Sequence, residues 1–323
     1  MYNAIKSFHK QFEYDPQVEN ESKLTTHKKF VVLGMGGSHL AADLLKTWNP
    51  FLDITIHRDY GIPPLHEEEL RDTLIIVSSY SGSTEEVIDG FKAAQEKNCS
   101  MAVITIGGEL LTLAEKAGIP YVRMPDTGIQ PRMALGYSLK ALFKLMGEET
   151  ALRELDDLAR NLNPSAYEED GKALACRLRG FVPLVYSSIQ NQPVAYIWKI
   201  KFNETGKIPA FFNVFPELNH NEMTGFDVKE STKGLSEKFY AVILKDPSDY
   251  FKVIRRMAVL IKLYQERGIK AEIIEMKGKT RLEKVFSSLI LADWAAYFLA
   301  EHYGVESEQV PMVEEFKKLV SWL

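Results

Sequence analysis

Residues 78–84 carry six hydroxyl side chains in seven positions, between the apolar run 74–77 and an amphipathic helical pattern that begins at Glu85. Serine and threonine hydroxyls can donate hydrogen bonds, as can the backbone N–H groups at a helix start, where the helix dipole favours an anion. A capping box of Ser83 with Glu86 is the alternative explanation, but it needs only one or two of these hydroxyls. This segment, the hydroxyl loop, therefore predicts a phosphate-binding site.

A glycine-rich loop, Gly-Met-Gly-Gly-Ser-His, follows the first predicted strand and suggests dinucleotide binding. That fingerprint, G-x-G-x-x-G, needs a third glycine where His39 stands, and NAD needs an acidic residue near Arg58, at the end of the second predicted strand. NAD is therefore disfavoured, and Arg58 leaves NADP as a weak alternative. Gly36, Gly37 and Ser38 instead predict a close backbone approach to a sugar phosphate beside the hydroxyl loop. We expect no cofactor.

The composition is that of an ordinary globular protein. Its 323 residues, 46% apolar and 26% charged, suffice for two domains of average size. A formal net charge of -5 argues against nucleic acid or an anionic membrane as the main partner. Cys99 and Cys176 show no metal or redox spacing, and the seven histidines are scattered, with no two of them at i, i+4. We therefore expect no metal. No apolar run has membrane-spanning length and no signal-peptide core is evident, so we expect a cytoplasmic protein.

Short β-rich runs alternate with longer helical patterns, which is typical of parallel α/β layering. Strands are predicted at residues 30–33, 54–57, 73–78, 101–106, 121–124, 182–186, 240–244 and 271–275. Helices are predicted from residues 38, 85 and 110, through most of 131–179, over 249–267 and 281–303, and from 311. We expect an α/β fold with two domains: residues 1–150, with the phosphate-binding loops, and residues 151–323.

Five short motifs follow one another along nearly the whole chain. They are the glycine loop at 33–38, the hydroxyl loop, Pro-Arg-Met-Ala-Leu at 131–135, a segment at 193–204 that ends in Asn-Glu, and Pro-Glu-Leu-Asn-His-Asn-Glu at 216–222. In this order they resemble the bifunctional phosphoglucose/phosphomannose isomerase family. The hydroxyl loop alone indicates only the superfamily, whereas the Asn-Glu and Glu-Leu-Asn-His-Asn segments are specific to this branch. The resemblance implies two SIS (sugar isomerase) domains, each a parallel β-sheet flanked by helices, in a homodimer.

The resemblance also implies an activity and a set of site residues. The activity is a metal-independent aldose-ketose isomerisation of glucose 6-phosphate and fructose 6-phosphate, and also of mannose 6-phosphate, by ring opening and proton transfer through a cis-enediolate. Glu204 matches the family's base, Arg132 the arginine that stabilises the enediolate, and Lys317 a lysine that helps ring opening. His220 matches the ring-opening histidine, which in the family reaches into the partner subunit's site. The residues that match the phosphate site are Gly36, Gly37, Ser38, Ser79, Ser81 and Thr84.

The neighbours of these residues agree with the implied roles. Partial desolvation beside Phe202 would raise the pKa of Glu204 toward neutrality, which suits a proton shuttle, although a solvated helix carboxylate is the simpler interpretation without the resemblance. Polar residues on both sides of His220 are partners that would fix its tautomer. Arg132 is a permanent cation suited to a developing negative charge. The alternative, a solvent-facing arginine, is disfavoured because helix starts do not favour cations.

Some positions depart from the family pattern. Val310 stands where relatives usually carry a threonine that is tied to accepting both epimers, which leaves the use of mannose 6-phosphate open. Lys318 is an alternative to Lys317. Residues 185–188, Val-Tyr-Ser-Ser, replace a glycine turn. A non-catalytic, sugar-phosphate-binding regulatory protein is the alternative function, and the presence of the predicted base, arginine and histidine argues against it.

Overall fold

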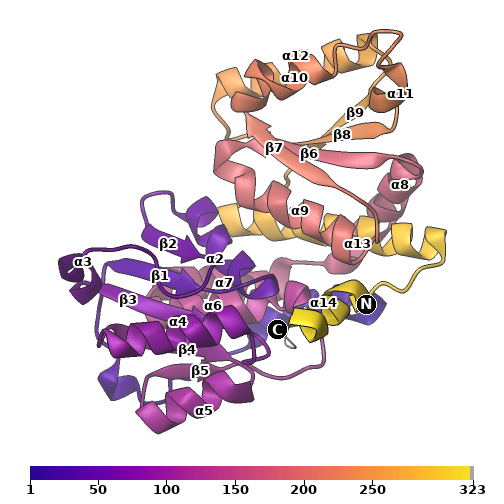
Figure 1. The fold of residues 1–323 in the computed structure, drawn as a ribbon. Coiled ribbons are helices and arrows are strands. Elements are labelled where there is room, and N and C mark those ends of the chain that lie inside the picture. The colour runs from indigo at the N-terminus through magenta and orange to yellow at the C-terminus, as the bar shows by residue number, and fades with distance from the viewer. Residues whose placement is uncertain (321–323) are drawn as a thin grey trace. The chain divides into compact units, whose positions relative to one another are not determined.

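The computed structural model describes residues 1–320, and the chain divides into two compact units (Figure 1). The N-terminal unit is Lys6–Asn163. The C-terminal unit is Pro164–Leu323 together with Met1–Ile5. Each unit holds one all-parallel β-sheet with helices packed on it, so the predicted α/β fold with two parallel sheets is confirmed.

The sheet of the N-terminal unit has five strands in the order β2-β1-β3-β4-β5. They are β1 (Lys29–Leu33), β2 (Asp53–His57), β3 (Thr73–Ser78), β4 (Ser100–Thr105) and β5 (Tyr121–Arg123). The longer helices are α2 (Gly37–Trp48), α4 (Glu85–Glu96), α5 (Gly108–Ala117), α6 (Leu135–Met146) and α7 (Glu149–Asn161). The short elements are η1 (Phe8–Glu13), η2 (Glu21–Lys23), α3 (Glu67–Arg71) and η3 (Pro131–Met133). Every residue of β3 is buried, as expected for a central strand that is covered on both faces.

The sheet of the C-terminal unit has four strands in the order β7-β6-β8-β9. They are β6 (Val182–Ser188), β7 (Phe211–Phe215), β8 (Phe239–Lys245) and β9 (Lys270–Glu275). The longer helices are α8 (Glu168–Leu178), α9 (Gln192–Glu204), α12 (Phe251–Glu266), α13 (Arg281–Tyr303) and α14 (Pro311–Val320). The short elements are α1 (Tyr2–Lys6), η4 (Pro164–Tyr167), η5 (Ile189–Asn191), η6 (Glu217–His220), α10 (Glu222–Gly225) and α11 (Lys233–Ser236). Within residues 1–320, no helix combines the length and the apolar character that a membrane crossing needs.

The two sheets share one topology, because β7-β6-β8-β9 repeats the order β2-β1-β3-β4. In each, the chain adds one neighbour on one side of the first strand and then returns to its other side. The carboxyl ends of β1 and β3, and those of β6 and β8, therefore flank topological switch points. Ligands of open α/β sheets bind at such points.

Candidate functional site

The hydroxyl loop joins β3 to α4 at the switch point of the N-terminal unit. Ser79 Oγ lies 2.9 Å from Thr84 Oγ1 and accepts a hydrogen bond from the N–H of Gly82 at 3.1 Å. Ser81 Oγ accepts from the N–H of Ser83 at 3.3 Å. The N-cap of α4 is Thr84, without a side-chain capping bond, so the capping box of Ser83 with Glu86 is not formed.

The glycine loop lies against the hydroxyl loop. Ser38 Oγ accepts a hydrogen bond from the N–H of Tyr80 at 2.8 Å, and Ser78 Oγ donates to the carbonyl of Ser38 at 3.2 Å. Gly37 allows a third segment to approach, because a Cβ on it would lie 2.7 Å from the backbone nitrogen of Arg132. The structure thus brings together the predicted phosphate residues of both loops and the backbone of Arg132.

The hydroxyl loop and the glycine loop together form a cradle, and backbone N–H groups orient its hydroxyls. A serine hydroxyl that accepts an N–H bond keeps its own proton to donate. Ser38, Ser79 and Ser81 all accept such bonds, and the start of α4 adds N–H groups and a favourable dipole. Such an arrangement of hydroxyl and backbone donors at a helix start suits a phosphate group.

Gly82 is the residue on which the shape of the cradle depends. Its φ is +70°, and a Cβ would lie 1.8 Å from the carbonyl oxygen of Gly107. We expect Gly82→Ala to weaken binding of inorganic phosphate and of fructose 6-phosphate at least tenfold, by displacing the loop. Isothermal titration measures the affinities. Gly147→Ala is the matched control, because Gly147 has φ +73° and nothing within 4 Å of its added Cβ. Equal losses in the two variants would contradict a role of this clash.

Arg132 lies in η3 and is only 2% exposed. The alternative of a solvent-facing arginine is therefore wrong. Burying a guanidinium is costly without compensation, so a large buried cation needs anionic or carbonyl partners around it. In a sugar-phosphate site, a developing enediolate is a partner of this kind.

Sequence reasoning missed a buried polar group beside the glycine loop. His39 Nδ1 lies 2.8 Å from Asp43 Oδ2, both side chains are buried, and Arg58 donates to the other oxygen of Asp43. The i, i+4 spacing of His39 and Asp43 within α2 was the available signal. This contact also engages Arg58, the residue that kept NADP open as an alternative.

In the C-terminal unit, Glu204 lies before the amino end of β7, and His220 lies after its carboxyl end. Glu204 is the last residue of α9, half-buried, on the side where β7 begins. His220 is exposed at the end of η6, after β7 has crossed the sheet. The five residues of β7 span about 17 Å, at about 3.4 Å of rise per residue. Along the chain, the two residues thus stand beyond opposite ends of β7.

The polar side chains next to His220 in sequence make their hydrogen bonds with other residues. Asn221 donates to Glu217 at 2.8 Å, and Asn219 accepts from Arg256 at 3.4 Å. Glu222 instead accepts bonds from Tyr186 and Asn213. Among the described residues, none of these side chains is hydrogen-bonded to the imidazole, so the expectation that they fix its tautomer is wrong.

Lys317 is exposed on α14, with its Nζ 2.9 Å from Glu314 Oε1. This pair at i, i+3 is of the weak surface type. The apolar side chains of α14 are exposed as well: Met312, Val313, Phe316 and Leu319. Val310 is half-buried, and its carbonyl accepts the N–H groups of Val313 and Glu314, which start the helix.

The second switch point, at the ends of β6 and β8, is filled by a carboxylate of the chain. Asp249 accepts hydrogen bonds from Ser188 Oγ at 2.5 Å and from Asn191 Nδ2 at 3.2 Å, and burial raises the pKa of its carboxyl. Ser188 belongs to the segment that replaces the family's glycine turn. A carboxylate of the chain thus lies where a ligand anion binds in such sheets, which makes the N-terminal unit the better candidate for phosphate binding.

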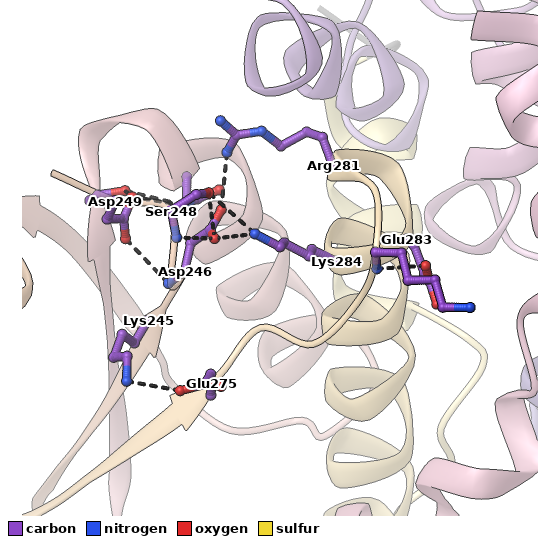
Figure 2. A network of polar contacts seen from close by, with 11 residues as sticks. Lys245, Asp246, Ser248, Asp249, Glu275, Arg281, Glu283 and Lys284 are labelled. Carbon is purple, nitrogen blue, oxygen red and sulfur yellow. Dashed lines mark hydrogen bonds and ion pairs between the residues drawn. The ribbon is translucent and has the colours of Figure 1, made fainter.

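A second carboxylate, Asp246, is fully buried next to this position and carries an ionic network (Figure 2). It pairs with Arg281 at 3.1 Å and Lys284 at 2.7 Å, both from the first turn of α13. Burial opposes ionisation, but the bonds from Lys284 and Ser248 outweigh it and lower the pKa of Asp246. The network fixes the end of β8 to α13. Among residues 1–320, no group of three or more His, Cys, Asp and Glu side chains could hold a metal ion.

Comparisons with known proteins show which proteins this chain is similar to. A family described as the bacterial phospho-glucose isomerase C-terminal SIS domain matches residues 167–320. Two relatives are named bifunctional phosphoglucose/phosphomannose isomerase: one from Aquifex aeolicus is 32% identical, over 98% of this chain and 97% of its own, and one from Caldicellulosiruptor bescii is 33% identical, over 98% and 96%. A D-glucosamine-6-phosphate 4-epimerase from Sulfolobus acidocaldarius is 29% identical, over 96% and 94%.

Among solved structures, the fold is similar to that of glucosamine-6-phosphate deaminase from Thermotoga maritima. The TM-score is 0.67 at 17% identity, over 96% of this chain and 95% of that one. At this identity the likeness concerns the fold alone. It agrees with the two sheets of shared topology described above.

Proposed function

Because the chain belongs to the bifunctional phosphoglucose/phosphomannose isomerase family, we propose that it interconverts glucose 6-phosphate and fructose 6-phosphate and also accepts mannose 6-phosphate. The observation that carries the proposal is the cradle of backbone-oriented hydroxyls at the first switch point, next to the backbone of buried Arg132. It offers a phosphate grip and a cation, which are two of the requirements of this isomerisation. A cytoplasmic place in glycolysis or gluconeogenesis is part of the same proposal, because these sugar phosphates are the substrates.

The reaction divides among the predicted residues. The hydroxyls of Ser38, Ser79, Ser81 and Thr84, with the backbone of Gly36 and Gly37, hold the phosphate. His220 and Lys317 assist ring opening, Glu204 moves a proton between C2 and C1, and Arg132 stabilises the negative enediolate oxygen. The base takes a proton from C2 and gives a proton to C1, with exchange against solvent protons possible in between, so the sugar is oxidised at one carbon and reduced at the next. No external electron acceptor is needed.

The placement of His220 supports a homodimer in which this residue serves the partner's site. Glu204 precedes β7 and His220 follows it, and the strand alone spans about 17 Å, whereas groups that act on one hexose must lie within a few ångströms of it. A second copy of the chain is the simplest source of the missing imidazole. Under this proposal, the monomer is inactive.

The test is turnover of fructose 6-phosphate to glucose 6-phosphate with EDTA present, run beside mannose 6-phosphate. Turnover in EDTA would establish a metal-independent isomerase. Binding of fructose 6-phosphate without turnover would favour the non-catalytic regulatory protein. If the protein neither binds nor turns over fructose 6-phosphate, the proposal is refuted. Glucosamine 6-phosphate would then be the substrate to examine, given the name of one relative.

Val310 is predicted to limit the use of mannose 6-phosphate. We expect Val310→Thr to raise kcat/KM for mannose 6-phosphate about fivefold relative to glucose 6-phosphate, the worth of one added hydrogen bond. Coupled assays with the two aldoses measure the ratio. Val313→Thr, on the exposed face of α14, is the control and should leave it unchanged. A wild-type protein that uses both epimers equally would show that valine is no barrier.

A further inference from the structure

Lys207 has a backbone conformation that is unusual for a lysine. Its φ is 55°, in the left-handed region where glycine is the common residue. It stands in the turn that follows α9, three residues after Glu204. Because a glycine would adopt this conformation without strain, the side chain of Lys207 is the feature that needs an explanation.

The ammonium group of Lys207 joins two segments that are distant in sequence. It donates to the carbonyl of Glu204 at 2.6 Å and also to the carbonyl of Gln309, 102 positions along the chain. The first carbonyl is among those that a helix leaves without an intrahelical partner at its carboxyl end, where a cation is also favoured by the helix dipole. The second immediately precedes Val310, whose own carbonyl starts α14.

Each of these segments is also held by bonds of its own. In the turn after α9, Asn203 Nδ2 donates to the carbonyl of Ile208 at 2.9 Å. In the other segment, the carboxylate of Glu306 accepts the N–H groups of Glu308 and Gln309, both at 2.6 Å. These bonds shape each segment separately. The ammonium of Lys207 fixes the one against the other.

We propose that Lys207 is a positioning residue that sets the predicted base, Glu204, at a fixed place relative to the segment 309–310 and the start of α14. The inference rests on the proposed function, because it concerns the same reaction. The base must reach the proton on C2, and Val310 is the position expected to sense which C2 epimer is bound. Lys207 therefore acts on rate and on epimer preference through its two carbonyl partners, without touching the sugar.

Three variants separate the ammonium from the backbone effect. Lys207→Met removes the charge and the hydrogen bonds but keeps the length of the chain, Lys207→Arg keeps a cationic donor, and Lys207→Gly removes the side chain while relieving the strained φ. We expect the methionine and glycine variants to lose about tenfold in kcat with KM within about twofold. Both should change the ratio of kcat/KM for mannose 6-phosphate to that for glucose 6-phosphate at least threefold. Lys207→Arg should recover most of both.

The outcomes are distinguishable. If the wild-type protein isomerises its substrates but the methionine and arginine variants behave alike, or the epimer ratio stays constant, Lys207 is only a turn residue and the inference is wrong. A wild-type protein without isomerase activity overturns the proposed function and this inference with it. Should Lys207→Met unfold, Lys207→Gly still decides the question, because its backbone is relaxed and its bridge is absent.

Discussion

Glu204→Gln is expected to lower the turnover of fructose 6-phosphate by about two to four orders of magnitude, with KM within about twofold of the wild-type value. Glutamine has the size of glutamate but takes up no proton at the pH of the reaction. The proposed phosphate-binding residues belong to the N-terminal unit and are all retained in this variant, so ground-state binding should survive. Coupled measurement of glucose 6-phosphate formation gives both constants.

A direct readout of the proton transfer makes this test sharper. Glucose 6-phosphate carrying deuterium at C2 should lose the label to solvent with the wild-type protein, because an enediolate intermediate allows exchange. Glu204→Gln should abolish the loss. Glu237→Gln removes an exposed carboxylate from the same unit and serves as the control that changes net charge equally. Near-normal exchange in Glu204→Gln would remove this residue from the mechanism.

The contact between the glycine loop and the hydroxyl loop was predictable because its signal is local. A strand, a run of hydroxyls and a helix start are contiguous in sequence, and parallel topology then places two such loops at one edge. Most predicted strands agree with the structure to within two residues, but β7 was missed. It is a half-buried edge strand with an asparagine in its middle, so it shows neither the continuous apolar run of a central strand nor a clear alternation.

The rest of the site depends on contacts between distant residues, which one sequence does not reveal. The ion pair between Asp43 and Arg58 depends on the position of β2 in the sheet. The hydrogen bond from Lys207 to the carbonyl of Gln309 joins residues that are 102 positions apart. The resemblance to the family, drawn from five motifs, is confirmed by full-length relatives. It supplied roles for Glu204 and His220 that their neighbours alone did not justify. Only the structure showed that Glu204 and His220 stand on opposite sides of strand β7 along the chain.

The two switch points show how one topology serves two purposes. At the first, neutral hydroxyls accept backbone N–H groups, an arrangement that suits an anion supplied by a ligand. At the second, Ser188 and Asn191 donate to Asp249, so the chain supplies the anion itself. The same strand order therefore gives one switch point predicted to bind a ligand and one with a structural role. The second edge anchors α13, and the segment after α13 leads to Val310 and Lys317.

A buried ion pair in the C-terminal unit gives the largest expected effect on stability. Lys201 of α9 and Asp293 of α13 are 0% and 1% exposed, with Nζ and Oδ1 2.5 Å apart. The carbonyl of Lys201 also accepts the N–H groups of Thr205 and Gly206, which follow Glu204 directly. The pair thus fixes the turn of α9 that ends at the predicted base.

Asp293→Ala is expected to destabilise the C-terminal unit by about 3–5 kcal/mol, because it leaves the Lys201 ammonium buried without its carboxylate. The double variant Lys201→Met with Asp293→Leu should recover most of this loss, since apolar side chains of similar volume replace a costly desolvated pair. Urea unfolding followed by far-UV circular dichroism measures both. Asp157→Ala, which breaks the exposed pair with Arg160, should change stability by less than about 0.5 kcal/mol. If the double variant regains stability but turns over fructose 6-phosphate more slowly than the wild type, the charges serve the geometry of Glu204 rather than the fold. If it regains both, the pair has no role beyond packing.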